Sequence, residues 1–220
     1  MASTVFADRA AAGEALGEVL RGIAGRPGEG VVLGIPRGGV EVAAPVARAL
    51  GLPLDVAVAR KVGAPGNPEL GLGAVGPGGV VVIDAHLSER LMVAREWLEQ
   101  RIAVLTEEVR QREEAFRAGR SPVPVDGRLV IVVDDGVATG GTARAVGQWL
   151  AGAGAATRVL AVPVGAPEPL EQLRGVYDDV LALAEPPGFR AVGQFYERFG
   201  PVSEDEVRRI LEEAATRPPS

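Results

Sequence analysis

The feature that most constrains this chain of 220 residues is an apolar run that ends in two adjacent carboxylates. Leu129–Val133 is short, continuously apolar and rich in β-branched side chains, which is typical of a strand buried on both faces of a parallel sheet. Asp134 and Asp135 follow at once, and a loop of small residues then leads into a helix-forming stretch that begins near Gly141. Open parallel sheets bind ligands at the carboxyl ends of their strands, so this strand predicts a binding site at one sheet edge.

Short apolar runs alternate with amphipathic stretches along the rest of the chain. This alternation predicts an α/β fold, a doubly wound and mainly parallel sheet with helices on both faces. No stretch has the composition of a linker, so we interpret residues 1–220 as a single domain. The expected strands cover residues 31–35, 54–59, 80–83, 129–133, 157–164 and 179–183, and the expected helices cover residues 8–25, 39–50, 88–118, 141–153, 167–174 and 203–215.

One predicted helix is much longer than the others. Residues 88–118 form a single helix in this interpretation, with Leu91, Leu98 and Leu105 at a spacing of seven. The stripe favours a helical insertion that covers the protein's own sheet. Pairing with a second copy in a homodimer is the alternative.

Composition argues against several classes of function. The net charge of −6 disfavours nucleic acid as a partner, because an acidic surface repels phosphates. The chain has no Cys, which rules out disulfides, thiolate metal sites and a Cys nucleophile. No secretory signal and no apolar run of membrane-spanning length is visible, so we expect a cytoplasmic protein without membrane contact.

The loop after the acidic pair is suited to hold an anion. Its small side chains let backbone N–H groups approach a phosphate, and the following helix directs its positive end to the same place. The neighbouring carboxylates accept hydrogen bonds from hydroxyl groups. A sugar phosphate needs both, and an ordinary Rossmann-like turn with two helix-capping Asp is the alternative. A dinucleotide-binding fold would place a G-x-G-x-x-G loop before its acid, whereas here the acids come first.

The stretch from Val130 to Ala145 resembles the signature of type I phosphoribosyltransferases that binds 5-phosphoribosyl 1-diphosphate (PRPP). Its end is most similar to the adenine-type enzymes. The resemblance implies a type I phosphoribosyltransferase-like, Rossmann-like fold with a small C-terminal hood, and it assigns the ribose hydroxyls to Asp134 and Asp135. It assigns the 5′-phosphate to the loop residues Val137, Ala138, Thr139, Gly140, Gly141 and Thr142.

A second strand–loop–helix unit lies upstream and contains Gly34–Val40. It resembles the diphosphate loop of the same family, and an ordinary Gly-rich turn is the alternative. The resemblance implies diphosphate contacts from Arg37, Gly38 and Gly39. It also implies a non-proline cis peptide, which falls at Pro36–Arg37.

A basic pair, Arg60 and Lys61, follows the second expected strand, and Lys61 is the only Lys in the chain. Related transferases carry a similar pair there, which implies PRPP binding by Arg60 and a diphosphate contact from Lys61; a solvated strand end is the alternative. Residues 62–79 are rich in Gly and Pro and are expected to be a mobile loop. Residues 62–73 lie where the family has its flexible lid, and a plain surface loop is the alternative.

Residues 184–200, after the last expected strand, are rich in aromatic side chains. The resemblance implies that this hood-like segment binds the acceptor. Phe189, Val192 and Tyr196 are the candidates for contact with a flat base, and filling of the core is the alternative.

Together these residues predict PRPP-dependent phosphoribosyl transfer to a small nitrogen acceptor, a nucleobase by resemblance, with release of pyrophosphate. The catalytic candidates are Asp134, Asp135, Lys61 and Arg37. Mg²⁺ is the expected cofactor because it binds substrate phosphates and water, and Asp134 and Asp135 would hold it directly or through substrate and water. A PRPP- or nucleotide-sensing regulator on the same fold is the alternative, and a sugar-phosphate hydrolase is a third hypothesis.

Overall fold

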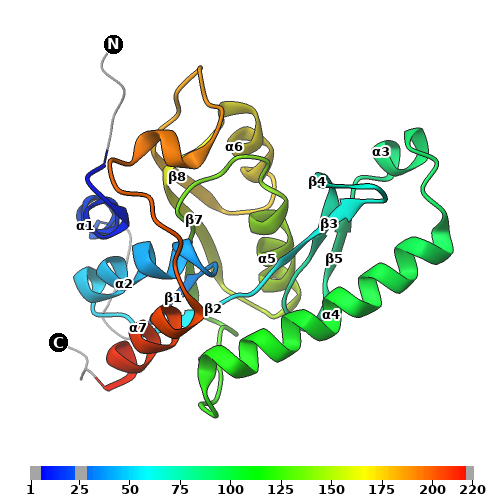
Figure 1. The fold of residues 1–220 in the computed structure, drawn as a ribbon. Helices are drawn as coiled ribbons and strands as arrows, with labels where there is room; N and C mark the ends of the chain where they lie inside the picture. The colour runs from blue at the N-terminus through cyan, green and yellow to red at the C-terminus, as the bar shows by residue number, and fades with distance from the viewer. Residues whose placement is uncertain (1–5, 23–28, 217–220) are drawn as a thin grey trace.

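The computed structural model describes residues 6–22 and 29–216, and its centre is a five-stranded parallel sheet (Figure 1). The strand order is β2-β1-β6-β7-β8, and Val32 of β1 lies opposite Ile131 of β6. The predicted α/β fold with a parallel sheet is confirmed. The strands are β1 (Gly30–Gly34), β2 (Leu54–Val56), β6 (Leu129–Val133), β7 (Thr157–Val164) and β8 (Asp179–Ala184).

Alternate residues of the central strands enter two apolar cores, one on each face of the sheet. Val31 and Val130 belong to one core, and Val32 and Ile131 belong to the other. This burial on both faces explains why the strands read as continuous apolar runs. The first core is covered by α5 (Gly141–Gly152) and α6 (Pro167–Leu173), and the second by α1 (Arg9–Leu20), α2 (Gly38–Leu50) and α7 (Glu204–Thr216) (Figure 1).

Residues 60–83 form a second, antiparallel sheet, which corrects the prediction of a loop over residues 62–79. Glycines that indicated a loop instead let neighbouring strands approach closely, because a Cβ at Gly73 would overlap the Val82 carbonyl oxygen. The small sheet lies between α5 and the long helix α4 (Figure 1). Its elements are β3 (Arg60–Ala64), β4 (Asn67–Val75), a 3-10 helix (Pro77–Gly79) and β5 (Val81–Ile83).

The helix predicted over residues 88–118 is two helices, α3 (Ala85–Arg90) and α4 (Arg95–Arg117). The break contains Met92, whose φ of +50° lies in the left-handed region in which helices end. Gly usually marks such an end, and a Met there carries no such signal. The buried side chains of α4 pack towards the small sheet, so the helix covers the protein's own strands as favoured above. No helix within residues 6–22 and 29–216 is both long and apolar enough to cross a bilayer.

Segments near the two ends of the chain pair beside the carboxyl edge of the large sheet. Phe6 and Tyr196 form a parallel bridge. The Phe6 N–H donates to the Phe195 carbonyl at 2.8 Å, and the Glu197 N–H donates to the Phe6 carbonyl at 2.9 Å. The hood-like segment, which includes a 3-10 helix at Val192–Phe195, is therefore fixed to the start of α1.

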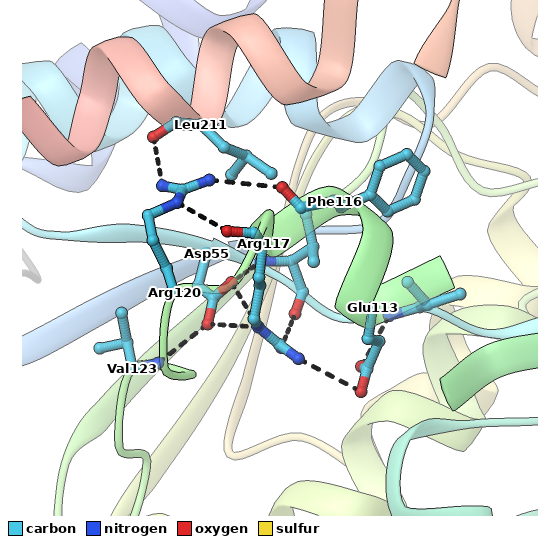
Figure 2. Close-up of polar contacts among 9 residues, drawn as sticks. Asp55, Glu113, Phe116, Arg117, Arg120, Val123 and Leu211 are labelled. Atoms are coloured by element: carbon cyan, nitrogen blue, oxygen red, sulfur yellow. Dashed lines mark hydrogen bonds and ion pairs between the residues drawn. The ribbon is translucent and has the colours of Figure 1, made fainter. Parts of the chain in front are cut away.

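Hydrogen bonds and ion pairs of a buried cluster of charged groups connect the C-terminal end of α4 to β2 (Figure 2). Asp55 accepts hydrogen bonds from Arg117 Nε at 3.0 Å and from the Val123 N–H at 2.9 Å. Arg117 also donates to the Val56 carbonyl at 3.0 Å and forms an ion pair with Glu113 at 3.4 Å. This cluster fixes the position of α4, and thereby supports the small sheet beneath it.

Candidate active site

The two strand–loop–helix units found in the sequence meet at the middle of the carboxyl edge of the large sheet. β1 is followed by β2 on one side and β6 by β7 on the other, so their ends flank the point where the winding reverses. Ligands of open α/β sheets bind at this point. A cavity of about 380 Å³ lies there, lined by Arg9, Ile35, Pro36, Arg37, Gly38, Ala59, Asp134, Asp135, Thr142, Phe199, Pro201 and Val202.

Asp134 and Asp135 both reach the cavity wall. The Asp135 N–H donates to Asp134 Oδ1 at 2.8 Å, and Arg9 Nε donates to Asp135 Oδ2 at 2.8 Å. Burial raises the pKa of Asp134 well above its usual range, and the neighbouring charge of Asp135 raises it further. Burial also raises the pKa of Asp135, although the Arg9 guanidinium opposes this shift. The two carboxylates therefore offer closely spaced hydrogen-bond acceptors. Their negative charge is costly in this buried site unless a cation or a hydrogen-bond donor lies beside it.

The loop after β1 packs directly on the acidic pair. The Pro36–Arg37 peptide is cis, at the position inferred from the resemblance. A Cβ at Gly38 would overlap Asp135 Oδ2, and one at Gly39 would lie 2.7 Å from a backbone oxygen of β6. Only glycine lets this loop lie so close to the end of β6. The loop and the two carboxylates thus form one continuous wall.

The loop after the acidic pair ends at the N-terminus of α5. Gly140 has a φ of +74°, and no side chain of the described residues caps the helix that begins at the next residue. Thr142, in the first turn of α5, lines the cavity, while residues 138–140 form the loop that leads into this turn. Val137 is buried and its N–H donates to the Val164 carbonyl at 2.9 Å. Val137 therefore fixes the loop, and its N–H is not free to bind an anion in this structure.

The basic pair lies outside the wall of this cavity. Arg60 and Lys61 belong to β3, whereas β2, the strand they were expected to follow directly, already ends at Val56. Arg60 forms an ion pair with Glu108 of α4 at 3.3 Å, and Ala59 is the residue of this segment that lines the cavity. The sequence indicated that Arg60 and Lys61 follow a strand of the large sheet. They lie in the small sheet instead, because β3 pairs with β4.

The three residues predicted for the acceptor also lie outside the cavity wall and form a small apolar cluster in the hood. Phe189 stacks on Phe195 with ring centroids 5.5 Å apart, and Val192 packs against the same cluster. Tyr196 is buried, and its hydroxyl donates to the Asp135 backbone carbonyl at 2.6 Å. Burial raises the pKa of Tyr196 above its ordinary value, so the hydroxyl stays protonated and supports Asp135 from behind.

Two parts of the cavity wall carry no signal in the sequence. Arg9 begins α1, and 126 positions separate it from its partner Asp135. Phe199, Pro201 and Val202 come from the segment between the hood and α7. These contacts join distant positions, so no local spacing or motif in one sequence indicates them.

Comparison with known proteins places this chain in a family. A family model described as the phosphoribosyl transferase domain matches residues 8–192. The chain belongs to this family. The lining residues Phe199, Pro201 and Val202 lie beyond the matched range.

Related proteins support the same membership. Two Mycobacterium tuberculosis proteins that carry the provisional name phosphoribosyl transferase are 43% identical over 216 residues, or 96% of this chain. The match covers 47% of each of them, so this phosphoribosyl transferase domain spans about half the length of these relatives. The crystal structure of the protein TT1426 from Thermus thermophilus is similar at 44% identity with a TM-score of 0.80, over 95% of this chain and 98% of that one.

Proposed function

We propose that this chain transfers the phosphoribosyl group of PRPP to a small nitrogen acceptor, a nucleobase, and releases pyrophosphate. One arrangement carries the proposal: the adjacent carboxylates and the first turn of α5, which has no side-chain cap among the described residues, line the same cavity. Carboxylates accept hydrogen bonds from ribose hydroxyls, and an uncapped helix N-terminus binds a phosphate. Membership in the phosphoribosyl transferase family supports this assignment.

The diphosphate of PRPP would lie against the loop after β1. Arg37 offers a forked cation there, and Gly38 and Gly39 can present backbone N–H groups without steric hindrance. Arg60 and Lys61 remain proposed diphosphate contacts. They would approach the cavity by movement of the β3–β4 hairpin that carries them, as lids do in many enzymes.

Cleavage of the bond between C1 and the diphosphate develops positive charge on the ribose and negative charge on the leaving group. The acidic pair would stabilise the first charge, and the cations of the diphosphate site would stabilise the second. The acceptor nitrogen supplies the electron pair of the new bond to C1, and the diphosphate leaves with the old pair. The chain then acts by positioning and electrostatics, and no covalent enzyme intermediate is required.

Mg²⁺ is the proposed cofactor. Asp134 and Asp135 supply adjacent carboxylate oxygens, which are the ligands that Mg²⁺ prefers. Within the described part of the chain, no cluster of three or more acidic, His or Cys side chains is built to hold a metal, so substrate phosphates and water would complete the coordination. When bound, the ion would neutralise charge on the diphosphate.

We propose that the acceptor lies against Phe199. This ring is 39% exposed and lines the cavity, where Pro201 and Val202 add apolar surface. Tyr196 supports it from beneath, with ring centroids 5.0 Å apart. A partly exposed aromatic ring beside apolar groups suits contact with a flat heterocycle.

One observation favours a second function, a PRPP- or nucleotide-sensing regulator. Arg60 is engaged by Glu108, away from the cavity. A sensor needs the anion cradle and the acidic pair, but it does not need additional cations to activate a leaving group.

The test is release of pyrophosphate from PRPP with Mg²⁺ across a panel of purines, pyrimidines and other nitrogen heterocycles. Transfer predicts pyrophosphate only when a suitable acceptor is present, and chelation of Mg²⁺ should stop it. Binding of PRPP without turnover on any acceptor would contradict transfer and support the sensor. Loss of PRPP without any acceptor would indicate a hydrolase.

Replacing Tyr196 by Phe should lower the free energy of unfolding by about 1–3 kcal/mol and weaken PRPP binding, because the Asp135 carbonyl loses its donor. Tyr177→Phe is the matched control, since its buried hydroxyl donates to the Ala143 carbonyl at 2.6 Å, and neither Tyr177 nor Ala143 lines the cavity. Chemical denaturation should show similar losses for both variants. Equal PRPP affinities in the two variants would show that Tyr196 does not support the site.

A further inference from the structure

Arg9 contacts four residues in and beside the cavity wall. Its Nε donates to Asp135 Oδ2 at 2.8 Å, and its Nη1 donates to the Gly200 carbonyl at 2.9 Å. The same Nη1 lies 3.5 Å from the Glu41 carboxylate on α2, and the guanidinium carbon lies 3.9 Å from the centre of the Phe199 ring. With a side chain only 8% exposed, this cation links the acidic pair to the proposed acceptor wall.

Contacts outside the cavity fix the point from which Arg9 projects. Asp8 caps α1, because its Oδ1 accepts a hydrogen bond from the Ala11 N–H at 2.9 Å. Phe6 pairs with the hood, and Arg198 forms an ion pair with Asp8 at 2.5 Å. The start of α1 is thus held in place, and Arg9 reaches Asp135 from a fixed position.

Charge explains why a cation is needed at this position. Asp134, Asp135 and Glu41 bring three carboxylates to one region, and Arg9 contacts two of them. Carboxylates that are partly withdrawn from water need a positive partner to stay ionised and oriented. Arg9 supplies that partner in a fixed, planar form.

We propose that Arg9 is a positioning residue for PRPP, one that holds the Asp135 carboxylate toward the ribose hydroxyls and fixes Phe199 beside them. The inference rests on the proposed function and adds a residue to it. Arg9 engages one oxygen of Asp135, and a carboxylate has about four acceptor sites, so the ribose hydroxyls still find acceptors there. Arg9 acts through Asp135 and takes no part in the bond change.

Calorimetry with two probes tests this role. PRPP with Mg²⁺ reports on the whole site, and pyrophosphate with Mg²⁺ reports on binding without a ribose. Arg9→Met should weaken PRPP binding at least about tenfold, because one charge-assisted contact of the ribose site is lost. Pyrophosphate binding should change less than about threefold, since salt screens the remaining effect of the lost charge. Arg9→Lys should recover part of the PRPP affinity, because it keeps the charge and loses the planar fork.

Arg21→Met is the matched control, because Arg21 lies at the other end of α1, is 58% exposed with Glu18 as its ion-pair partner, and does not line the cavity. It should bind PRPP as the wild type does. Unchanged or tighter PRPP binding by Arg9→Met would overturn the inference, and so would equal weakening for both probes. If Arg9→Met does not fold, wild-type PRPP affinity in Arg9→Lys would overturn it instead. A wild type that binds no PRPP would overturn the proposed function itself, together with this inference.

Discussion

Replacing Asp134 and Asp135 together by Asn should reduce PRPP turnover by roughly 10²- to 10⁴-fold, because two charge-assisted contacts to the ribose are lost. The chain should still fold. Burial raises the pKa of both carboxyls, so their charges are costly in the native state and neutral amides relieve that cost. The measurement is Mg²⁺-dependent PRPP consumption, with thermal unfolding followed in parallel.

The control for this pair is Asp205→Asn. Asp205 lies on α7, exposed, with Arg208 as its ion-pair partner, and is absent from the cavity lining. It should leave turnover unchanged. Retained turnover in the Asp134→Asn, Asp135→Asn variant would remove the assignment of the sugar site, whereas loss of turnover together with unfolding would contradict the claim that these charges serve binding.

Replacing Arg117 by Met should lower the free energy of unfolding by about 3–5 kcal/mol, because it leaves the buried carboxylate of Asp55 without its cation. Figure 2 shows why the loss spreads: Arg117 bonds Asp55, Glu113 and a backbone carbonyl of β2 at once. In the same cluster, Arg120 donates to the Leu211 carbonyl of α7 at 2.7 Å. Urea denaturation at neutral pH gives the measurement.

The matched control is Arg110→Met on the same helix. Arg110 also forms ion pairs with neighbouring Glu side chains, but it is 56% exposed against 13% for Arg117, so water replaces the lost partners. Its effect should be far smaller. Adding Asp55→Asn to Arg117→Met should recover part of the stability, since the buried side chain at position 55 then carries no unpaired charge. Equal losses of unfolding free energy in Arg117→Met and Arg110→Met would show that the buried cluster does not stabilise the contact between α4 and β2.

Short-range physics decides the parts of the fold that were predictable from local patterns. Leu129–Val133 and Thr157–Val164 have the predicted bounds, because β-branched runs buried on both faces leave few alternatives to a strand. The capped start of α1 and the start of α5 at Gly141 also follow from residues within a few positions of each other. None of these predictions required knowledge of how distant elements pack.

Tertiary contacts decide the parts that were predicted wrongly. Most of the Gly-rich residues 62–79 belong to β3 and β4, because each of these strands has a neighbouring strand to pair with. A short sequence window does not reveal such a partner. The end of α3 at Met92 lacks the usual glycine signal.

The candidate site divides in the same way. Its acidic pair and both Gly-containing loops are local motifs, and the structure brings them together at one sheet edge. The proposed acceptor wall is different. Aromatic density indicated Phe189, Val192 and Tyr196, which fill a cluster in the hood, whereas the partly exposed ring on the cavity is Phe199. Burial decides whether an aromatic side chain fills the core or lines the cavity, and burial depends on the tertiary fold.

A crystal structure of the chain with PRPP and Mg²⁺ tests the central claim most directly. Ribose hydroxyls should lie within hydrogen-bond distance of Asp134 and Asp135, and the 5′-phosphate should lie at the N-terminus of α5 near Thr142. PRPP bound at any other place, or an empty cavity at saturating concentration, would contradict it.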